Sequence, residues 1–155
     1  MEGPRHVAAV PQARGRSNVS SGLPSLVALM LLASCSTSPS APRAVSLAES
    51  FTLAPGQTVE VEGTGLRVTF ESVSADSRCP EDVTCVWEGD AVVIVSVQAT
   101  GSARVQRELH TSARYPTEVD AGGYRVRLVE VVPVPRSAAS PAPGDYRVTL
   151  LVSRR

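Results

Sequence analysis

The chain has 155 residues and no lysine, and its equal numbers of basic and acidic side chains give a formal net charge of zero. From residue 36 onward there are twelve arginines against fourteen acids, a net charge of −2. This composition provides no basic field to attract nucleic acid, and the lack of lysine excludes Schiff-base chemistry. Beyond residue 6 the only histidine is His110, so sites with several histidine ligands are excluded too.

The N-terminal region has the order of a secretory signal, in which basic residues precede an apolar run. Arg5, Arg14 and Arg16 come before "LPSLVALMLLA" at residues 23–33. A transmembrane helix needs about twenty apolar residues, and this run stops well short of that length. The pattern therefore predicts a cleaved signal peptide over residues 1–34.

The apolar run ends in "LASC", residues 32–35, which resembles the lipobox of bacterial lipoproteins. The resemblance implies that Cys35 is thioether-linked to diacylglycerol, and that the new amino terminus is acylated, as with palmitate. Several acyl chains hold a protein stably on a membrane. Ser36 in place of Asp implies the outer membrane, at its periplasmic face or the cell surface, if the cell is Gram-negative. The alternative is an ordinary cleavable signal followed by a chance cysteine.

Two further segments follow the signal peptide. Residues 35–49 are rich in Ser, Pro and Ala and predict a flexible tether, because such a composition cannot bury enough apolar surface to order itself. Residues 50–155 are of ordinary length for a single domain with its own core.

Alternation of apolar and polar residues dominates the domain and predicts strands. The candidate strands are "TVEVE" 58–62, "LRVTFESV" 66–73, "AVVIVSVQA" 91–99, "RVQRELH" 104–110, "YRVRLVEVVPV" 124–134 and "YRVTLLV" 146–152. No helix is predicted beyond the signal peptide. The fold class is therefore all-β, an antiparallel β-sandwich, either immunoglobulin-like or a partly open barrel, of about seven strands.

Three details of this pattern carry structural expectations. The segment 91–99 is apolar on both faces, which predicts an interior strand. The alternation slips at Glu130, which predicts a β-bulge or a bend. Four prolines in residues 132–145 predict an extended, exposed loop before the last strand.

The segment "DSRCPEDVTCVWEGD" at residues 76–90 holds Cys79 and Cys85 with five residues between them. A structural disulfide, a metal site and a redox pair are the alternatives. A redox pair usually has two residues between its cysteines, and zinc needs more ligands than these two and a distant His110. With Cys35 lipidated, the remaining pair faces an oxidising compartment, which favours a disulfide contributing about 2 kcal/mol.

The same segment is a candidate binding loop with five acids and one arginine. Its candidate residues are Asp76, Arg78, Glu81, Asp82, Trp87, Glu88 and Asp90. This charge would suit calcium, but no recognised calcium spacing is present, so we expect no metal and no cofactor. The favoured interpretation is a solvated acidic turn with Trp87 packed over the disulfide.

Arg78, Cys79, Pro80, Cys85, Trp87 and Gly89 form an RCP…C-W-G motif, followed by "GGYRVRLVEVVPVP" and "YRVTLLV". These features resemble a group of small exported bacterial proteins and lipoproteins of unassigned function, over most of residues 58–152. The resemblance implies fold and location, and it transfers no catalytic residue.

Two classes of function remain open. The favoured one is a non-catalytic binding or structural module, not an enzyme, that presents the loop to a protein partner, as an inhibitor of a secreted enzyme would. The alternative is an envelope hydrolase with His110 as base beside Glu108. Against it, these two residues lie on the outward face of an alternating strand and no nucleophile motif accompanies them.

Replacing Cys35 by Ala is expected to abolish incorporation of labelled fatty acid and to release the protein from membranes, because no thioether can form. The measurement is labelling with radioactive palmitate followed by fractionation, with Ser34→Ala as a control that keeps the cysteine. A labelled, membrane-bound Cys35→Ala protein would contradict the lipid anchor.

Overall fold

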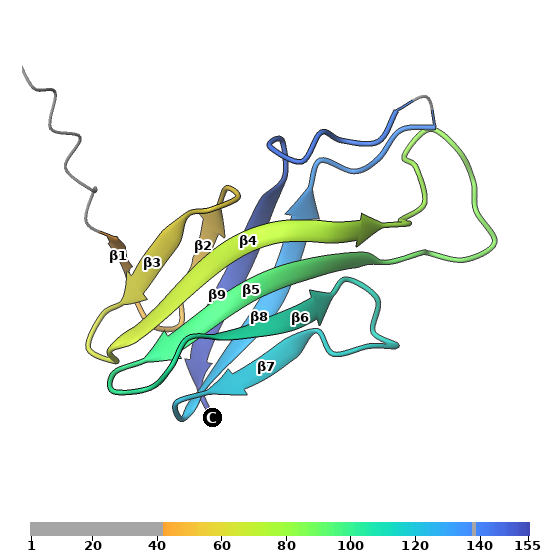
Figure 1. Ribbon diagram of the computed structural model, residues 1–155. Coiled ribbons are helices and arrows are strands. Elements are labelled where there is room, and N and C mark those ends of the chain that lie inside the picture. Colours follow the sequence, from red (N-terminus) through yellow and green to blue (C-terminus); the bar gives the residue numbers. More distant parts are fainter. Residues whose placement is uncertain (1–41, 138) are drawn as a thin grey trace, which may run out of the picture. The chain divides into compact units, whose positions relative to one another are not determined.

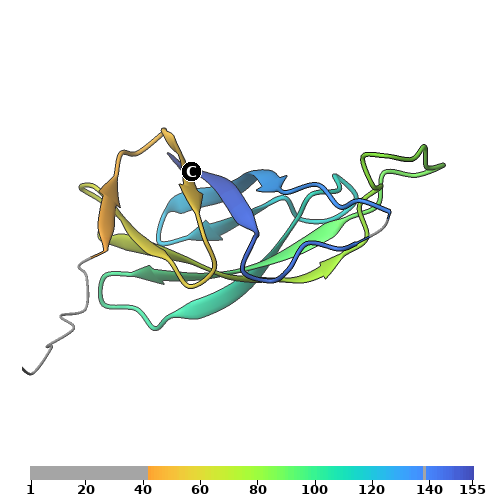
Figure 2. The same cartoon turned by 90° about the horizontal axis from the view of Figure 1, so that it is seen from above.

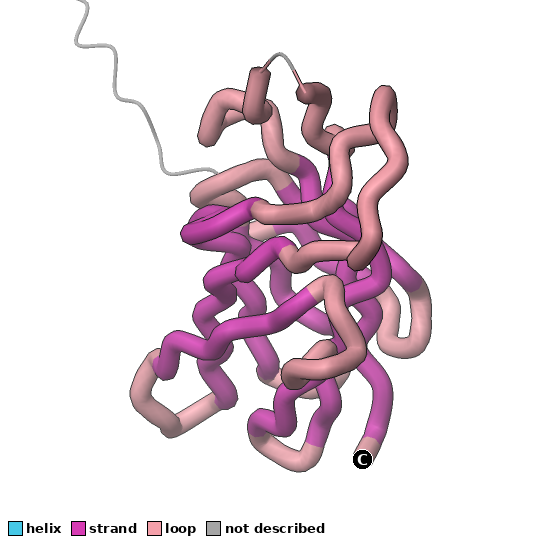
Figure 3. Tube along the Cα trace, turned by 90° about the vertical axis from the view of Figure 1, so that its right-hand side faces the viewer, coloured by secondary structure: helices cyan, strands magenta, loops and turns pink. Residues whose placement is uncertain are grey.

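The computed structural model describes residues 42–137 and 139–155, which form nine strands (Figures 1 and 3). The predicted all-β sandwich is confirmed. The predicted signal peptide, Cys35 and residues 36–41 of the predicted tether lie outside the described residues. Within the described ranges, no helix is long and apolar enough to cross a membrane.

The strands form two sheets that lie one over the other (Figure 2). The five-stranded sheet has the order β1 (Arg43–Val45), β3 (Thr58–Val61), β4 (Leu66–Asp76), β5 (Ala91–Ala99) and β6 (Val105–His110). The four-stranded sheet has the order β2 (Ser50–Leu53), β9 (Arg147–Arg154), β8 (Tyr124–Val132) and β7 (Glu118–Ala121). All neighbours are antiparallel except β1 and β3, which are parallel.

The core lies between the inward faces of the two sheets and follows the predicted alternation. Leu66, Val68 and Phe70 of β4 are fully buried, as are Val148 and Leu150 of β9. Burying an aliphatic or aromatic side chain of this size stabilises a fold by roughly 1.5 to 3 kcal/mol. The rigid frame that carries the loops is therefore built from the alternating residues of the long strands.

Several expectations from the sequence are met in detail, and three strands are additional. β5 lies between β4 and β6, as predicted for residues 91–99. The register of β8 against β9 shifts between Leu128 and Glu130, which confirms the bulge. The short strands β1, β2 and β7 were not predicted, and β1 falls within the range 35–49 assigned to the tether. In strands of three or four residues the alternation repeats at most twice, which makes it a weak signal unless, as in β3, polar and apolar residues alternate strictly.

The hairpin of β4 and β5 positions the segment of interest. These two strands are among the longest, with eleven and nine residues, and they end together with Asp76 opposite Ala91. The connection between them protrudes at the right of Figure 1, beside the connection between β8 and β9. Residues 77–90 therefore lie at one end of the sandwich, next to the proline-rich segment.

Candidate functional site

The connecting segment 77–90, here called the 77–90 loop, begins as an extension of the β4–β5 hairpin. The amide of Ser77 donates to the Asp90 carbonyl at 2.7 Å, and that of Cys79 to the Glu88 carbonyl at 3.0 Å. Gly89 has φ +71°, and a Cβ atom there would lie 1.9 Å from the Ser77 carbonyl oxygen. Only glycine allows the two limbs to approach this closely.

A disulfide closes the outer part of the 77–90 loop. Cys79 and Cys85 are bonded, with their Cα atoms 5.9 Å apart, so the disulfide interpretation is confirmed. Within the closed ring, the amide of Val83 donates to the Pro80 carbonyl at 3.3 Å. The ring is thus a compact turn at the end of the two paired limbs.

A buried ion pair fixes the base of the loop. Arg78 Nη2 lies 2.6 Å from Asp76 Oδ2, and the two side chains are only 12% and 5% exposed. The same guanidinium donates to the carbonyls of Val131 and Pro133, at the end of β8. The hydroxyl of Tyr146, which precedes β9, donates to Asp76 Oδ2 at 3.0 Å. These contacts join the loop and β4 to the opposite sheet.

The charge of this cluster is set by competing effects on the pKa of Asp76. Burial raises the pKa of the carboxyl, but the hydrogen bonds and charge of Arg78, together with the Tyr146 hydroxyl, outweigh it and lower the pKa below 3.8. Burial and the neighbouring Asp76 raise the pKa of Tyr146. Asp76 is therefore ionised at neutral pH, which an ion pair with Arg78 requires.

A second set of contacts joins the loop to the proline-rich segment. Asp82 accepts hydrogen bonds from the Ser137 amide at 2.8 Å and from the Ser137 hydroxyl. The amide of Glu81 donates to the Pro135 carbonyl at 3.0 Å, and its carboxylate pairs with Arg136. Most described residues of this proline-rich segment are exposed, as predicted, and in addition it supports residues 81 and 82.

A third set of contacts fixes the returning limb. Asp90 Oδ2 lies 2.7 Å from His110 Nδ1, and Asp90 Oδ1 accepts from the Ser112 amide at 2.9 Å and the Thr111 hydroxyl at 3.1 Å. Burial raises the pKa of Asp90, but these bonds outweigh it and lower the pKa. The Ser112 hydroxyl donates to Glu88 Oε1 at 2.8 Å.

His110 lies within this third set of contacts, at the end of β6. Its side chain is 14% exposed and stacks on Tyr115 with ring centroids 4.8 Å apart. The alternation of β6 places His110 on the outward face, as predicted, because its neighbour Leu109 is buried in the core. Unlike the exposed Glu108, however, His110 is covered, because the chain folds back at residues 112–115 and Tyr115 packs on the ring. The nearby hydroxyls of Thr111 and Ser112 both donate to carboxylates. In this arrangement His110 orients Asp90 and activates neither hydroxyl.

The tip of the loop is exposed and apolar. Residues 81–88 are all exposed, and Val86 and Trp87 are 92% and 71% exposed. The expectation that Trp87 packs over the disulfide is wrong, because it follows the closed ring on a connection that projects beyond both sheets (Figures 1 and 2). Below it, Tyr115 and Arg114 line a small cavity with Trp87. Val83, Val86 and Trp87 are here called the apolar tip.

The acids of the loop have a common role that their spacing did not reveal. Each is engaged by a neighbour: Asp76 by Arg78, Glu81 by Arg136, Asp82 by Ser137, Glu88 by Ser112 and Asp90 by His110. Within residues 42–137 and 139–155, no group of three or more His, Cys, Asp or Glu residues is placed to hold a metal ion. Six of the seven candidate residues, the five acids and Arg78, therefore hold the loop in place. The seventh, Trp87, is the exposed side chain that the loop carries.

Comparisons with known proteins add no further constraint, since no family model, no curated protein and no solved structure matches this chain. Function is therefore argued from the site alone.

Replacing both loop cysteines by Ser is expected to leave the sandwich folded and to lower the free energy of unfolding by about 2 kcal/mol. The core lies in the strands and does not include the disulfide. Urea unfolding followed by circular dichroism measures the loss, and limited proteolysis is expected to cut first between residues 80 and 86. A double variant without β structure, or one as stable and protease-resistant as wild type, would disprove this division of roles.

Replacing Asp76 by Asn is expected to lower the free energy of unfolding at pH 7 by about 3 kcal/mol or more, because it leaves Arg78 buried without its partner. The pKa of Asp76 is lowered on folding, so its stabilisation is full above the unfolded-state value of 3.8 and is lost as the pH falls through the folded-state value. The difference in free energy of unfolding between wild type and Asp76→Asn is therefore expected to become smaller below pH 3.8.

The measurement is urea unfolding at a series of pH values between 7 and 2. Glu130→Gln, at an exposed position of β8, is the matched control and is expected to follow wild type. Tyr146→Phe removes one hydrogen bond to Asp76 and is expected to cost about 1 kcal/mol. A gap that stays constant down to pH 2 would show that Asp76 is not held ionised by this cluster.

Proposed function

We propose that this protein is an exported, lipid-anchored binding module that engages a protein partner through the apolar tip of the 77–90 loop. The observation that carries the proposal is the exposure of Val86 and Trp87 on a loop whose polar groups are bound to the domain itself. Tryptophan is enriched among the residues that dominate binding energy at protein interfaces. A domain that needed Trp87 only for its own stability would bury it.

Rigidity of the loop supports a role in binding. Binding costs about 0.5 to 1.5 kcal/mol for each flexible side chain that becomes immobilised, and ordering a loop adds to that cost. Here the disulfide, the Asp76–Arg78 ion pair and the contacts of Asp82 with Ser137 hold the loop before any partner arrives. Because the loop is already ordered, less free energy is lost on binding, and a small contact area can give a higher affinity.

The charge around the apolar tip indicates the chemistry of the partner. Glu81, Asp82 and Glu88 flank Val86 and Trp87, and all five residues are exposed. A complementary surface therefore has an apolar pocket for the tryptophan and a basic rim for the carboxylates. An enzyme of the cell envelope that is inhibited by the loop would be one partner of this kind.

Location in the envelope follows from the lipobox resemblance at residues 32–35. A lipid on Cys35 and a tether would hold the domain close to a membrane, with the loop free to meet proteins in the same compartment. The disulfide supports this location, because such bonds persist in oxidising compartments.

A photo-crosslinking amino acid at Val86 is expected to give a discrete adduct with one protein in intact cells. Val129, an exposed valine on β8 of the other sheet, is the matched control position and is expected to give none. With the identified partner, Trp87→Ala is expected to weaken binding by about 2 kcal/mol or more, a roughly thirtyfold higher Kd, measured by titration calorimetry.

Thermal unfolding of Trp87→Ala provides the folding control, and its midpoint is expected to match wild type because Trp87 is outside the core. Equal crosslinking from both valines, or a Trp87→Ala variant that keeps wild-type affinity, would refute the loop as the contact surface.

A further inference from the structure

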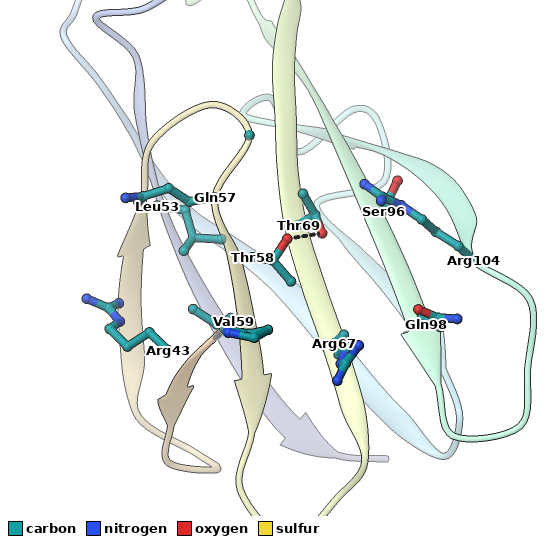
Figure 4. Close-up of a pocket in the computed structure, with 12 residues that line it drawn as sticks. Arg43, Leu53, Gln57, Thr58, Val59, Arg67, Thr69, Ser96, Gln98 and Arg104 are labelled. Atoms are coloured by element: carbon teal, nitrogen blue, oxygen red, sulfur yellow. Dashed lines mark hydrogen bonds between the residues drawn. The ribbon is translucent and has the colours of Figure 1, made fainter. Parts of the chain in front are cut away.

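The outer face of the five-stranded sheet holds a groove of about 560 Å³ (Figure 4). The strand segments that line it lie at the end of the domain opposite the 77–90 loop (Figure 1). Its sides are formed by β1, β3, the first half of β4, the second half of β5 and Arg104. Binding pockets for small molecules commonly have volumes between about 300 and 1,000 Å³. The groove is thus large enough to hold a small ligand.

Polar side chains of neighbouring strands form the floor of this groove. Thr58, Thr69 and Ser96 lie opposite one another on β3, β4 and β5, and the two threonine hydroxyls are 2.8 Å apart (Figure 4). Although they are on the outer face, Thr69 and Ser96 are only 6% and 2% exposed. The Ser96 hydroxyl, although buried, has no hydrogen-bond partner among the described residues.

Three guanidinium groups line the same groove. Arg67 pairs with Glu60 at 3.3 Å and Arg104 pairs with Glu71, both through side chains that are partly or largely exposed. Arg43 donates to the Thr52 carbonyl and forms no ion pair within the described part of the chain. A guanidinium carries five N–H donors, and these contacts leave most of them unused. The groove therefore has guanidinium donors available for an anion, and Arg43 supplies a charge that no acid of the described residues pairs with.

Two amide side chains complete the lining with complementary functions. Gln57 accepts a hydrogen bond from the Ala54 amide through Oε1, so its NH2 group remains available as a donor. Gln98 donates to the Ser102 carbonyl through Nε2, so its Oε1 remains available as an acceptor. A ligand hydroxyl both donates and accepts hydrogen bonds, and the two amides together offer both functions.

We propose that this groove binds an anionic saccharide. Its carboxylate or sulfate groups bind to Arg43, Arg67 and Arg104, and its hydroxyls bind to Gln57 and Gln98. Arginine suits planar anions because its donors form a fork that matches carboxylate geometry. Leu53 and Val59 of the lining are buried, and the surface exposed in the groove is more polar than apolar, which favours a hydrated ligand over a lipid. A net charge of −2 over residues 36–155 disfavours a long polyanion.

The test is titration calorimetry on the full chain, purified in mild detergent, with four probes. Trigalacturonate and a sulfated disaccharide are the anionic saccharides, maltotriose is the neutral saccharide, and inorganic sulfate is the free anion. At least one anionic saccharide is expected to bind tenfold or more tightly than maltotriose and sulfate, and to bind less tightly as salt is raised. In NMR spectra, the side-chain amide signals of Gln57 and Gln98 are expected to shift.

Arg67→Gln and Arg43→Gln are each expected to weaken saccharide binding by about fivefold, which corresponds to about 1 kcal/mol. Arg127→Gln is the matched control, an exposed arginine on β8 of the other sheet, and is expected to bind as wild type does. Thermal unfolding checks that each variant is folded.

Three results would overturn the proposal. If neither anionic saccharide binds, the groove is not such a site. If sulfate binds as tightly as the saccharides, the groove is a simple anion site. If Arg127→Gln weakens binding as much as Arg67→Gln, the saccharide is attracted by the overall charge of the protein and not by the arginines of the groove. Since none of these probes involves Trp87, the outcome is independent of the function proposed for the apolar tip.

Discussion

The ion pair between Asp76 and Arg78 is the contact on which the arrangement of the functional end depends. Asp76 is the last residue of β4, and Arg78 reaches from the start of the loop to the carbonyls of Val131 and Pro133 on the opposite sheet. Tyr146 adds a bond from the chain entering β9. Two ions this deeply buried are costly to desolvate, and they are tolerated because hydrogen bonds satisfy both of them. The cluster thereby fixes the direction in which the loop leaves the sandwich.

The outer part of the loop depends on this base. The disulfide closes a small ring, and the contacts of Asp82 with Ser137 and of Asp90 with His110 hold its two sides. From the sequence alone, the carboxylates of the loop are candidates for contact with a partner. In the structure they form hydrogen bonds and ion pairs within the molecule. Val86 and Trp87 are left as exposed apolar surface for intermolecular contact, flanked by the exposed carboxylates of Glu81, Asp82 and Glu88. The polar contacts beneath the apolar tip fix the loop, so that a small domain can keep apolar side chains exposed for binding.

The sequence predicted the sandwich, the interior position of residues 91–99, the bulge at Glu130 and the disulfide, because these depend on alternation and on cysteine spacing. It did not predict the exposure of Trp87 or the covered position of His110. The position of the loop that carries Trp87 depends on contacts between segments far apart in the chain, such as that of Ser137 with Asp82. The cover over His110 depends on the way the chain folds back at residues 112–115, which strand alternation does not reveal. Short strands such as β1 were missed for a different reason, since three residues show no period.

The groove is another feature that the sequence alone did not predict. Arg43, Arg67 and Arg104 are distant in sequence, and as isolated residues they suggest only a solvated face. The fold brings them to one concave surface, over a floor that holds the hydroxyl of Ser96, which has no hydrogen-bond partner in the described part of the chain. The domain therefore separates its surface chemistry into two ends, one apolar with acidic flanks and the other polar and basic.

The central claim is that residues 81–88 are held rigid before any partner binds. Backbone order parameters from 15N relaxation test it most directly, with the oxidised wild-type protein and no ligand. The account predicts values near 0.85 for the amides of Val86 and Trp87, as in the strands of the sandwich. Values below about 0.6 for these amides, with rigid strands, would show a flexible loop and would contradict it.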